Sequence, residues 1–346
     1  LVAERSPLAR GQGSQGIVAP DPARGVARDG ASPKDEQVER AINVRPALPR
    51  PSTAPKALAE PRSSEAMSAD SAPELGLEIT PDSSWQVHET ASFRILHKNQ
   101  PLARDVGKLA EHVRREQSLK WLGKIAATPW SPKCDIMLFP TAADYARVTG
   151  LPADSPGFST MGLNAGRVIT RRVNARADHP QLLTSVLPHE ITHVVVSEAF
   201  PNDPIPRWAD EGMAVLSERE HDQLARAADL TEPVQGGKVF PITDLLRLDQ
   251  PDREYWSLYY AQSVSVTRFL VERGTPAKFL QFLKRASQRG WKEELRASYG
   301  INGYDDFQKQ WLKFAKESAI AARAALSEGA TAIEGNPQVD EAAPRP

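Results

Sequence analysis

Apolar residues follow two different spacings along this chain. Alternating or continuous apolar runs predict strands over Trp85–His97, Lys133–Phe139 and Gly157–Val173, the last divided into two pieces by the turn residues Asn164-Ala165-Gly166. Helical spacing, with caps and breakers at its ends, predicts helices over Leu102–Leu122, Thr141–Val148, Leu182–Ala199, Trp208–Glu218, Tyr255–Glu272, Pro276–Ser287, Trp291–Tyr299 and Tyr304–Leu326. This order predicts an α+β fold, in which a small mixed sheet with two helices is followed by a helical part.

The ends of the chain lack the residues that build a core. Residues 1–84 contain no Phe, Trp or Tyr, and ten prolines precede residue 75. We therefore expect 1–74 to be a disordered Pro-rich arm or linker and 327–346 to be a disordered tail. Between them we expect an α+β first part over 75–180 and a helical part over 181–326. A Pro-rich leader also suits a spacer after an export signal or anchor, so we expect a periplasmic, extracellular or externally anchored protein.

Composition excludes several classes of function. The chain has 346 residues and a net charge of −1, which provides no general attraction to nucleic acid or to anionic membranes. It contains no apolar run long enough to span a bilayer. Its one cysteine, Cys134, cannot form an internal disulfide, and a cysteine-rich zinc module is excluded.

The candidate chemistry lies in an apolar helix that contains His189-Glu190-Ile191-Thr192-His193. Residues four apart lie on one helix face, so His189 and His193 can direct two imidazoles at one metal ion. Glu190 is then placed to take a proton from water. Pro188 lies within this apolar stretch and is expected either to kink the helix or to mark its start. Two core histidines without a metal are the alternative interpretation.

Catalytic zinc needs a third protein ligand and an open fourth position. The metzincin pattern requires Gly and His where this chain has Val196 and Ala199, so that class is excluded. A glutamate from a following antiparallel helix is the other solution, and Glu211 is followed by Gly212, which permits a close backbone approach. Asp210 and Glu198 remain alternative third ligands.

The combination of H-E-x-x-H with the later W-x-x-E-G-x-A over Trp208–Ala214 resembles the gluzincin metallopeptidases, in particular the bacterial peptidase-MA-like domains. The resemblance implies a thermolysin-like zincin fold, one Zn²⁺ held by His189, His193 and Glu211, and Glu190 as general base. The stretch Tyr260-Ala261-Gln262-Ser263 resembles the tyrosine-led helix of aminopeptidase-type gluzincins. By position, oxyanion stabilisation falls on Tyr260, with Tyr259 as the competing choice.

These residues lead to a functional hypothesis with two alternatives. The main hypothesis is a zinc-dependent metallopeptidase that hydrolyses peptide bonds with metal-activated water, acting on a peptide or protein. A non-catalytic peptide- or protein-binding module that retains the zincin fold is the alternative, but a purely structural zinc site has no need of Glu190. A metallohydrolase with a different substrate is a further possibility. The strand around Arg167–Arg172 is expected to be an edge strand that could pair with an extended peptide.

Overall fold

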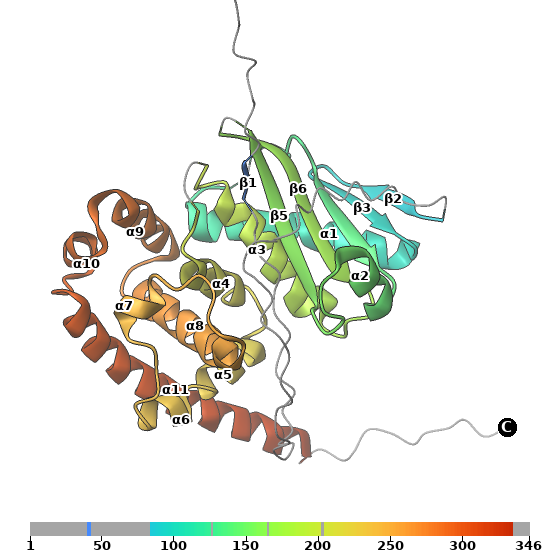
Figure 1. Cartoon of the computed structure of the whole chain (residues 1–346). Helices are drawn as coiled ribbons and strands as arrows, with labels where there is room; N and C mark the ends of the chain where they lie inside the picture. Colours follow the sequence, from blue (N-terminus) through green and yellow to red (C-terminus); the bar gives the residue numbers. More distant parts are fainter. Residues whose placement is uncertain (1–39, 43–83, 126, 165, 202–203, 335–346) are drawn as a thin grey trace, which may run out of the picture. The chain divides into compact units, whose positions relative to one another are not determined.

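The computed structural model describes residues 40–42, 84–125, 127–164, 166–201 and 204–334, which all fall in one compact unit, Val38–Pro346. Its first part is a mixed sheet with the strand order β1-β5-β6-β4-β3-β2 (Figure 1). The strands are β1 (Arg40–Ile42), β2 (Gln86–Glu89), β3 (Phe93–His97), β4 (Cys134–Phe139), β5 (Gly157–Asn164) and β6 (Arg167–Arg176). β4 runs parallel to β3 and β6, and the remaining pairs are antiparallel.

Two sequence-based expectations about the strands need correction. The segment Trp85–His97 forms two strands, because residues after Glu89 turn so that β2 and β3 pair as a hairpin. The expected edge strand at Arg167–Arg172 is wrong, since β6 lies between β5 and β4. The alternation of polar and apolar residues in β6 reflects two sheet faces and carries no information about strand order.

Three helices cover the sheet. α1 (Gln100–Leu122) and α3 (Leu187–Ser197) pack on one face, and α2 (Ala142–Thr149) packs on the other (Figure 1). The first face contributes Phe93, Ile95, Cys134, Ile136, Leu138, Val173 and Ala175 to a shared core. Thr141 caps α2 as its sequence predicts, accepting a hydrogen bond from the backbone N–H of Asp144.

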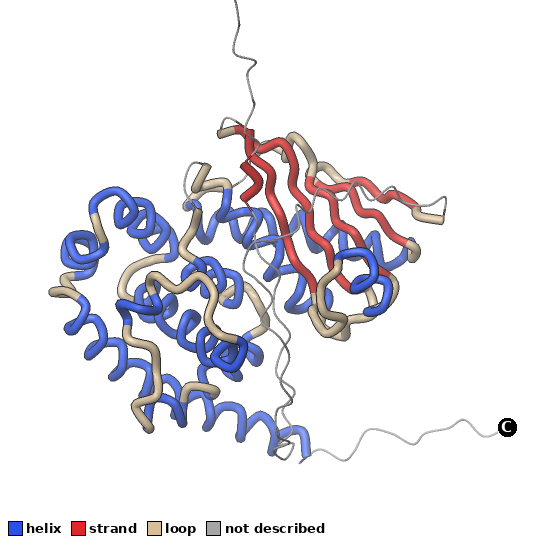
Figure 2. Tube along the Cα trace, in the orientation of Figure 1, coloured by secondary structure: helices blue, strands red, loops and turns tan. Residues whose placement is uncertain are grey.

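Helices joined by loops make up the rest of the described chain (Figure 2). They are α4 (Arg207–Val215), α5 (Glu220–Ala228), α6 (Thr231–Gln235), α7 (Ile242–Leu245), α8 (Trp256–Glu272), α9 (Pro276–Arg289), α10 (Trp291–Tyr299) and α11 (Tyr304–Glu334), with a short 3₁₀ turn, η2 (Arg253–Tyr255), before α8. Their core is rich in aromatic side chains, including Trp208, Phe279 and Trp311. The short helices α5–α7 lie where the sequence pattern predicts none. The α+β fold expected from the sequence, a mixed sheet followed by a helical region, is confirmed.

The termini differ in part from the expected organisation. Arg40–Ile42 forms β1 within the range expected to be an arm, and the rest of 1–74 lies outside the described residues. α11 continues to Glu334, beyond the expected end at Leu326, because the alanine-rich segment after Ser318 favours helix. The expected tail at 327–346 overlaps this helix, and 335–346 lie outside the described residues. None of the described helices has the length and apolar character needed to cross a membrane.

Candidate metal centre

The helix that carries the two histidines, α3, begins at Leu187, one residue before Pro188. One π-helical turn, η1 (Leu182–Val186), precedes α3, and Pro188 occupies the first turn of α3, where its missing N–H costs no hydrogen bond. The hydroxyl of Ser185 donates to Asp222 on α5 at 2.5 Å, which ties η1 to the helical part. Pro188 therefore lies in the first turn of α3, and the helical backbone before it continues into η1.

Three side chains from two helices meet in the interior. The Nε2 atoms of His189 and His193 on α3 lie 3.1 Å apart. The Oε2 atom of Glu211 on α4 lies 3.6 Å from Nε2 of His189 and 3.8 Å from Nε2 of His193. All three residues are at least 95 % buried, with relative exposures of 5, 1 and 2 %. In the part of the chain that the structure describes, this is the one group of His, Cys, Asp and Glu side chains arranged to hold a metal ion.

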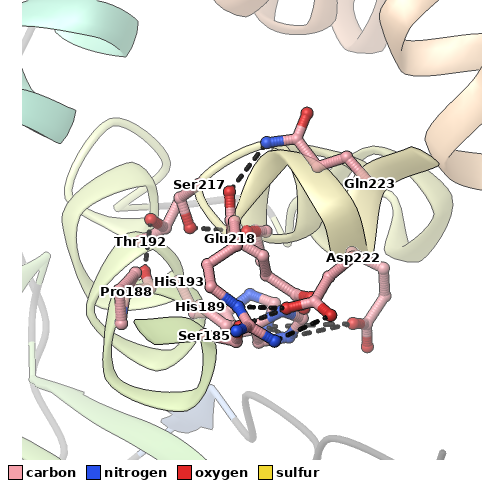
Figure 3. Close-up of polar contacts among 12 residues, drawn as sticks. Ser185, Pro188, His189, Thr192, His193, Ser217, Glu218, Asp222 and Gln223 are labelled. Carbon is pink, nitrogen blue, oxygen red and sulfur yellow. Dashed lines mark hydrogen bonds and ion pairs between the residues drawn. The ribbon is translucent and has the colours of Figure 1, made fainter. Parts of the chain in front are cut away.

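Two further carboxylates lie against the Nδ1 sides of the imidazoles. Oε1 of Glu218 lies 2.9 Å from Nδ1 of His189, and Oδ1 of Asp210 lies 2.9 Å from Nδ1 of His193 (Figure 3 shows the histidines with Glu218). Each contact favours the proton on Nδ1 and leaves Nε2 free to act as a ligand, which is the usual arrangement around a metal-bound histidine. Asp210 thus contacts the back of a histidine ring and lies outside the three-atom cluster.

Sequence reasoning missed Glu218. The residue follows Glu211 by seven positions, a spacing that returns to the same helix face after two turns, so a signal existed. However, α4 ends at Val215, and the chain bends before Glu218 reaches back to His189. Glu198, considered as a third ligand, is engaged elsewhere: it accepts a hydrogen bond from Nε of Arg171 at 3.1 Å.

The carboxylates give this cluster a strong preference for positive charge. Burial lowers the pKa of His189, but the neighbouring carboxylates of Glu211 and Glu218 outweigh it and raise that pKa to about 10. Burial likewise raises the pKa of Glu211, but His189 and the positive charge of Arg207 outweigh it and bring that pKa to about 2. Such a site stabilises a cation at the three facing ligand atoms.

Glu190 lies beside the cluster and against strand β5. It is 1 % exposed, and burial raises its pKa, opposed by the two histidines and by the nearby hydroxyl of Ser159 on β5. A Cβ at Gly157 would lie 3.5 Å from Cγ of Glu190 and 2.9 Å from the carbonyl oxygen of Asn174. Glycine at position 157 therefore accommodates the close carbonyl oxygen of Asn174, while β5 lies within van der Waals distance of the Glu190 side chain.

The two candidate tyrosines on α8 point to different partners. The Tyr259 hydroxyl donates to the carbonyl oxygen of Leu248 at 2.8 Å, as a core tyrosine does. The Tyr260 side chain is 8 % exposed, and its hydroxyl lies close enough to Arg207 to favour the charged guanidinium. Arg207 also contacts Glu211, so Tyr260 is the tyrosine on the side of the metal-ligand cluster.

The three facing atoms fit a zinc ion. Zinc–ligand distances of about 2.1 Å in a tetrahedral arrangement place ligand atoms about 3.4 Å apart. The observed separations of 3.1, 3.6 and 3.8 Å bracket that value. In addition, Oε2 of Glu211 is buried and has no hydrogen-bond partner among the described residues, a costly state that a bound cation would relieve.

Comparison with known proteins gives one family match. Residues 175–317 match the family model described as the Peptidase MA superfamily. The matched range begins in β6, ends in α11 and contains every residue of the cluster described above. No curated protein matches the chain.

Proposed function

Because residues 175–317 form a Peptidase MA superfamily domain with a buried His-His-Glu cluster, we propose that this protein is a zinc-dependent metallopeptidase of the gluzincin type. The observation that carries the proposal is the convergence of Nε2 of His189, Nε2 of His193 and Oε2 of Glu211, with Glu190 on the same helix as the two histidines. A structural zinc site commonly fills its fourth position with a protein ligand, whereas this cluster supplies three.

His189, His193 and Glu211 would hold the zinc ion. When bound, zinc supplies Lewis acidity, which polarises the scissile carbonyl and lowers the pKa of water to about 7. Glu218 and Asp210 keep the two imidazoles oriented for this task through their Nδ1 contacts.

Glu190 is the proposed general base. It takes the proton from the attacking water at a carboxylate oxygen and passes it to the nitrogen of the leaving amine. Burial raises its pKa, which makes its carboxylate a stronger base than an exposed glutamate. The hydroxyl of Tyr260 is the proposed donor to the oxyanion that develops on the scissile carbonyl, a role with a typical effect of about 3–4 kcal/mol on the barrier. The substrate class is a peptide or protein.

The test compares wild type, Glu190→Gln and the matched control Glu198→Gln. Glu198 directly follows α3 and pairs with Arg171, away from the cluster. We expect one zinc per chain in all three proteins, measured by elemental analysis. Cleavage of a mixed peptide library should be present in wild type and Glu198→Gln and reduced about a hundredfold or more in Glu190→Gln.

Each other outcome contradicts a defined part of the proposal. Zinc in all three proteins with no peptide cleavage by wild type would favour a binding module that retains the zincin fold. Full cleavage by Glu190→Gln would exclude Glu190 as the base. Absence of metal from wild type after incubation with zinc would contradict the metal site itself.

A further inference from the structure

The two carboxylate oxygens of Glu211 face different groups. Oε2 is directed at the Nε2 atoms of His189 and His193, at 3.6 and 3.8 Å. Oε1 lies 3.4 Å from Nη2 of Arg207, one helical turn earlier on α4. The carboxylate is therefore divided, with one oxygen in the metal-ligand cluster and the other on a guanidinium.

Arg207 is itself held in place on several sides. Its guanidinium lies over the ring of Trp256 on α8, 4.7 Å from the ring centroid, and the Tyr260 hydroxyl on the same helix lies nearby. The Arg207 side chain is only 10 % exposed. An arginine stacked on an aromatic ring keeps its planar donors in a fixed direction, which a flexible ammonium group does not.

We propose that Arg207 is a positioning residue that holds Glu211 as a one-oxygen ligand and thereby keeps a coordination position open for water or substrate. A carboxylate can bind a metal through one oxygen or through both, and the second oxygen would take up a further position. Arg207 opposes this second mode, because rotating Oε1 toward the metal would break its contact with the guanidinium and leave a buried charge poorly paired.

This inference rests on the proposed metal site, and it does not require that the protein cleave peptides. The test uses the full chain loaded with Co²⁺, whose visible d–d absorption weakens when coordination number rises from four to five. The proteins are wild type, Arg207→Met, Arg207→Lys and Arg285→Met. The last is a matched control, because it removes an arginine–glutamate contact between α9 and α10, where Arg285 lies 2.7 Å from Glu294.

We expect one Co²⁺ per chain and an intense four-coordinate spectrum for wild type and Arg285→Met. Arg207→Met should bind one Co²⁺ with a severalfold weaker spectrum, as Glu211 engages through both oxygens. Arg207→Lys, which restores the charge without the planar fork, should give an intermediate spectrum. A wild-type spectrum in Arg207→Met would overturn the proposal.

If Arg207→Met fails to fold or to bind cobalt, Arg207→Lys decides: a spectrum weaker than that of wild type supports the role, and an unchanged one refutes it. Peptide cleavage, measured separately, distinguishes the two proposals. Wild type that binds Co²⁺ without cleaving peptides would contradict the peptidase function and leave the coordination test valid. Wild type that binds neither Co²⁺ nor Zn²⁺ would overturn both.

Discussion

Oε2 of Glu211 lies 3.6 Å from Nε2 of His189, although the two residues belong to separate helices joined by a proline-containing loop. This proximity depends on how closely α4 packs against its two neighbouring helices, α3 and α8. Gly212, next to Glu211, permits the second contact: a Cβ there would lie 2.1 Å from Oγ1 of Thr267 and 3.0 Å from the carbonyl oxygen of Ser263 on α8.

Gly212→Ala should therefore destabilise the fold. Overpacking of this kind costs about 1–3 kcal/mol, partly offset by up to about 1 kcal/mol from the better helix propensity of alanine. Urea unfolding measures the change, with Gly236→Ala as the control, since the nearest atom to a Cβ there is 3.2 Å away. Adding Thr267→Ala should relieve the closest contact and make the double variant more stable than additivity predicts. If Gly212→Ala is as stable as wild type, α4 and α8 can move apart without a loss of folding free energy.

Glu211→Ala should abolish tight metal binding. The substitution removes one of three ligands, and we expect the metal affinity to fall by more than about a hundredfold, beyond the effect of losing a residue that only orients a ligand. Competition with a chromophoric chelator measures the dissociation constant. Tight binding by Glu211→Ala would place the third ligand elsewhere, with Asp210 as the first residue to test.

Glu218→Gln should weaken metal binding without changing its stoichiometry. The amide can still contact Nδ1 of His189, but it lacks the charge that makes the imidazole a stronger ligand. A loss of about 10- to 100-fold in zinc affinity is expected, by the same chelator competition. Asp210→Asn should behave similarly through His193. Equal affinities in these variants and wild type would reduce both carboxylates to packing roles.

Tyr260→Phe and Tyr259→Phe form a matched pair on one helix. Loss of an oxyanion donor should lower kcat of Tyr260→Phe by about 10²–10³ while zinc content stays at one per chain. Tyr259→Phe should keep its kcat and lose about 1 kcal/mol of stability, because its hydroxyl donates to Leu248 in the core. The reverse pattern of kcat values would assign the catalytic role to Tyr259.

Lys120 makes the stability of the fold depend on pH in the alkaline range. Its Nζ donates to the carbonyl oxygen of Leu216 at the end of α4, while burial, and then the charge of Arg268, lower its pKa to about 8. The unfolded chain, with a lysine pKa of about 10.4, binds more protons between these values, so stability should rise with pH there. We expect a gain of about 1 kcal/mol between about pH 7 and about pH 9.

Lys120→Met provides the control for this dependence. Its urea midpoint should lack the rise that wild type shows over the same interval, and the difference between the two proteins isolates Lys120 from other titrating groups. A wild-type curve parallel to that of Lys120→Met would contradict the lowered pKa.

The sequence alone determined the local features of this protein. The pairing of His189 and His193 follows from helix geometry, since residues four apart share a face whatever surrounds them. The cap at Thr141 and the succession of a sheet and a helical region follow likewise from residue chemistry and periodicity that act over short distances. The W-x-x-E-G-x-A stretch also indicated the helix from which a third ligand could come.

Only the tertiary structure decided which groups meet across elements. It placed β6 inside the sheet, brought Glu218 to the back of His189, and set one oxygen of Glu211 toward the histidines and the other toward Arg207. These relations depend on strand order, on the bend after Val215 and on the packing of α4 against α8. Such features arise from long-range packing, in which small shifts of whole elements decide which atoms touch, and no periodicity along the chain encodes them.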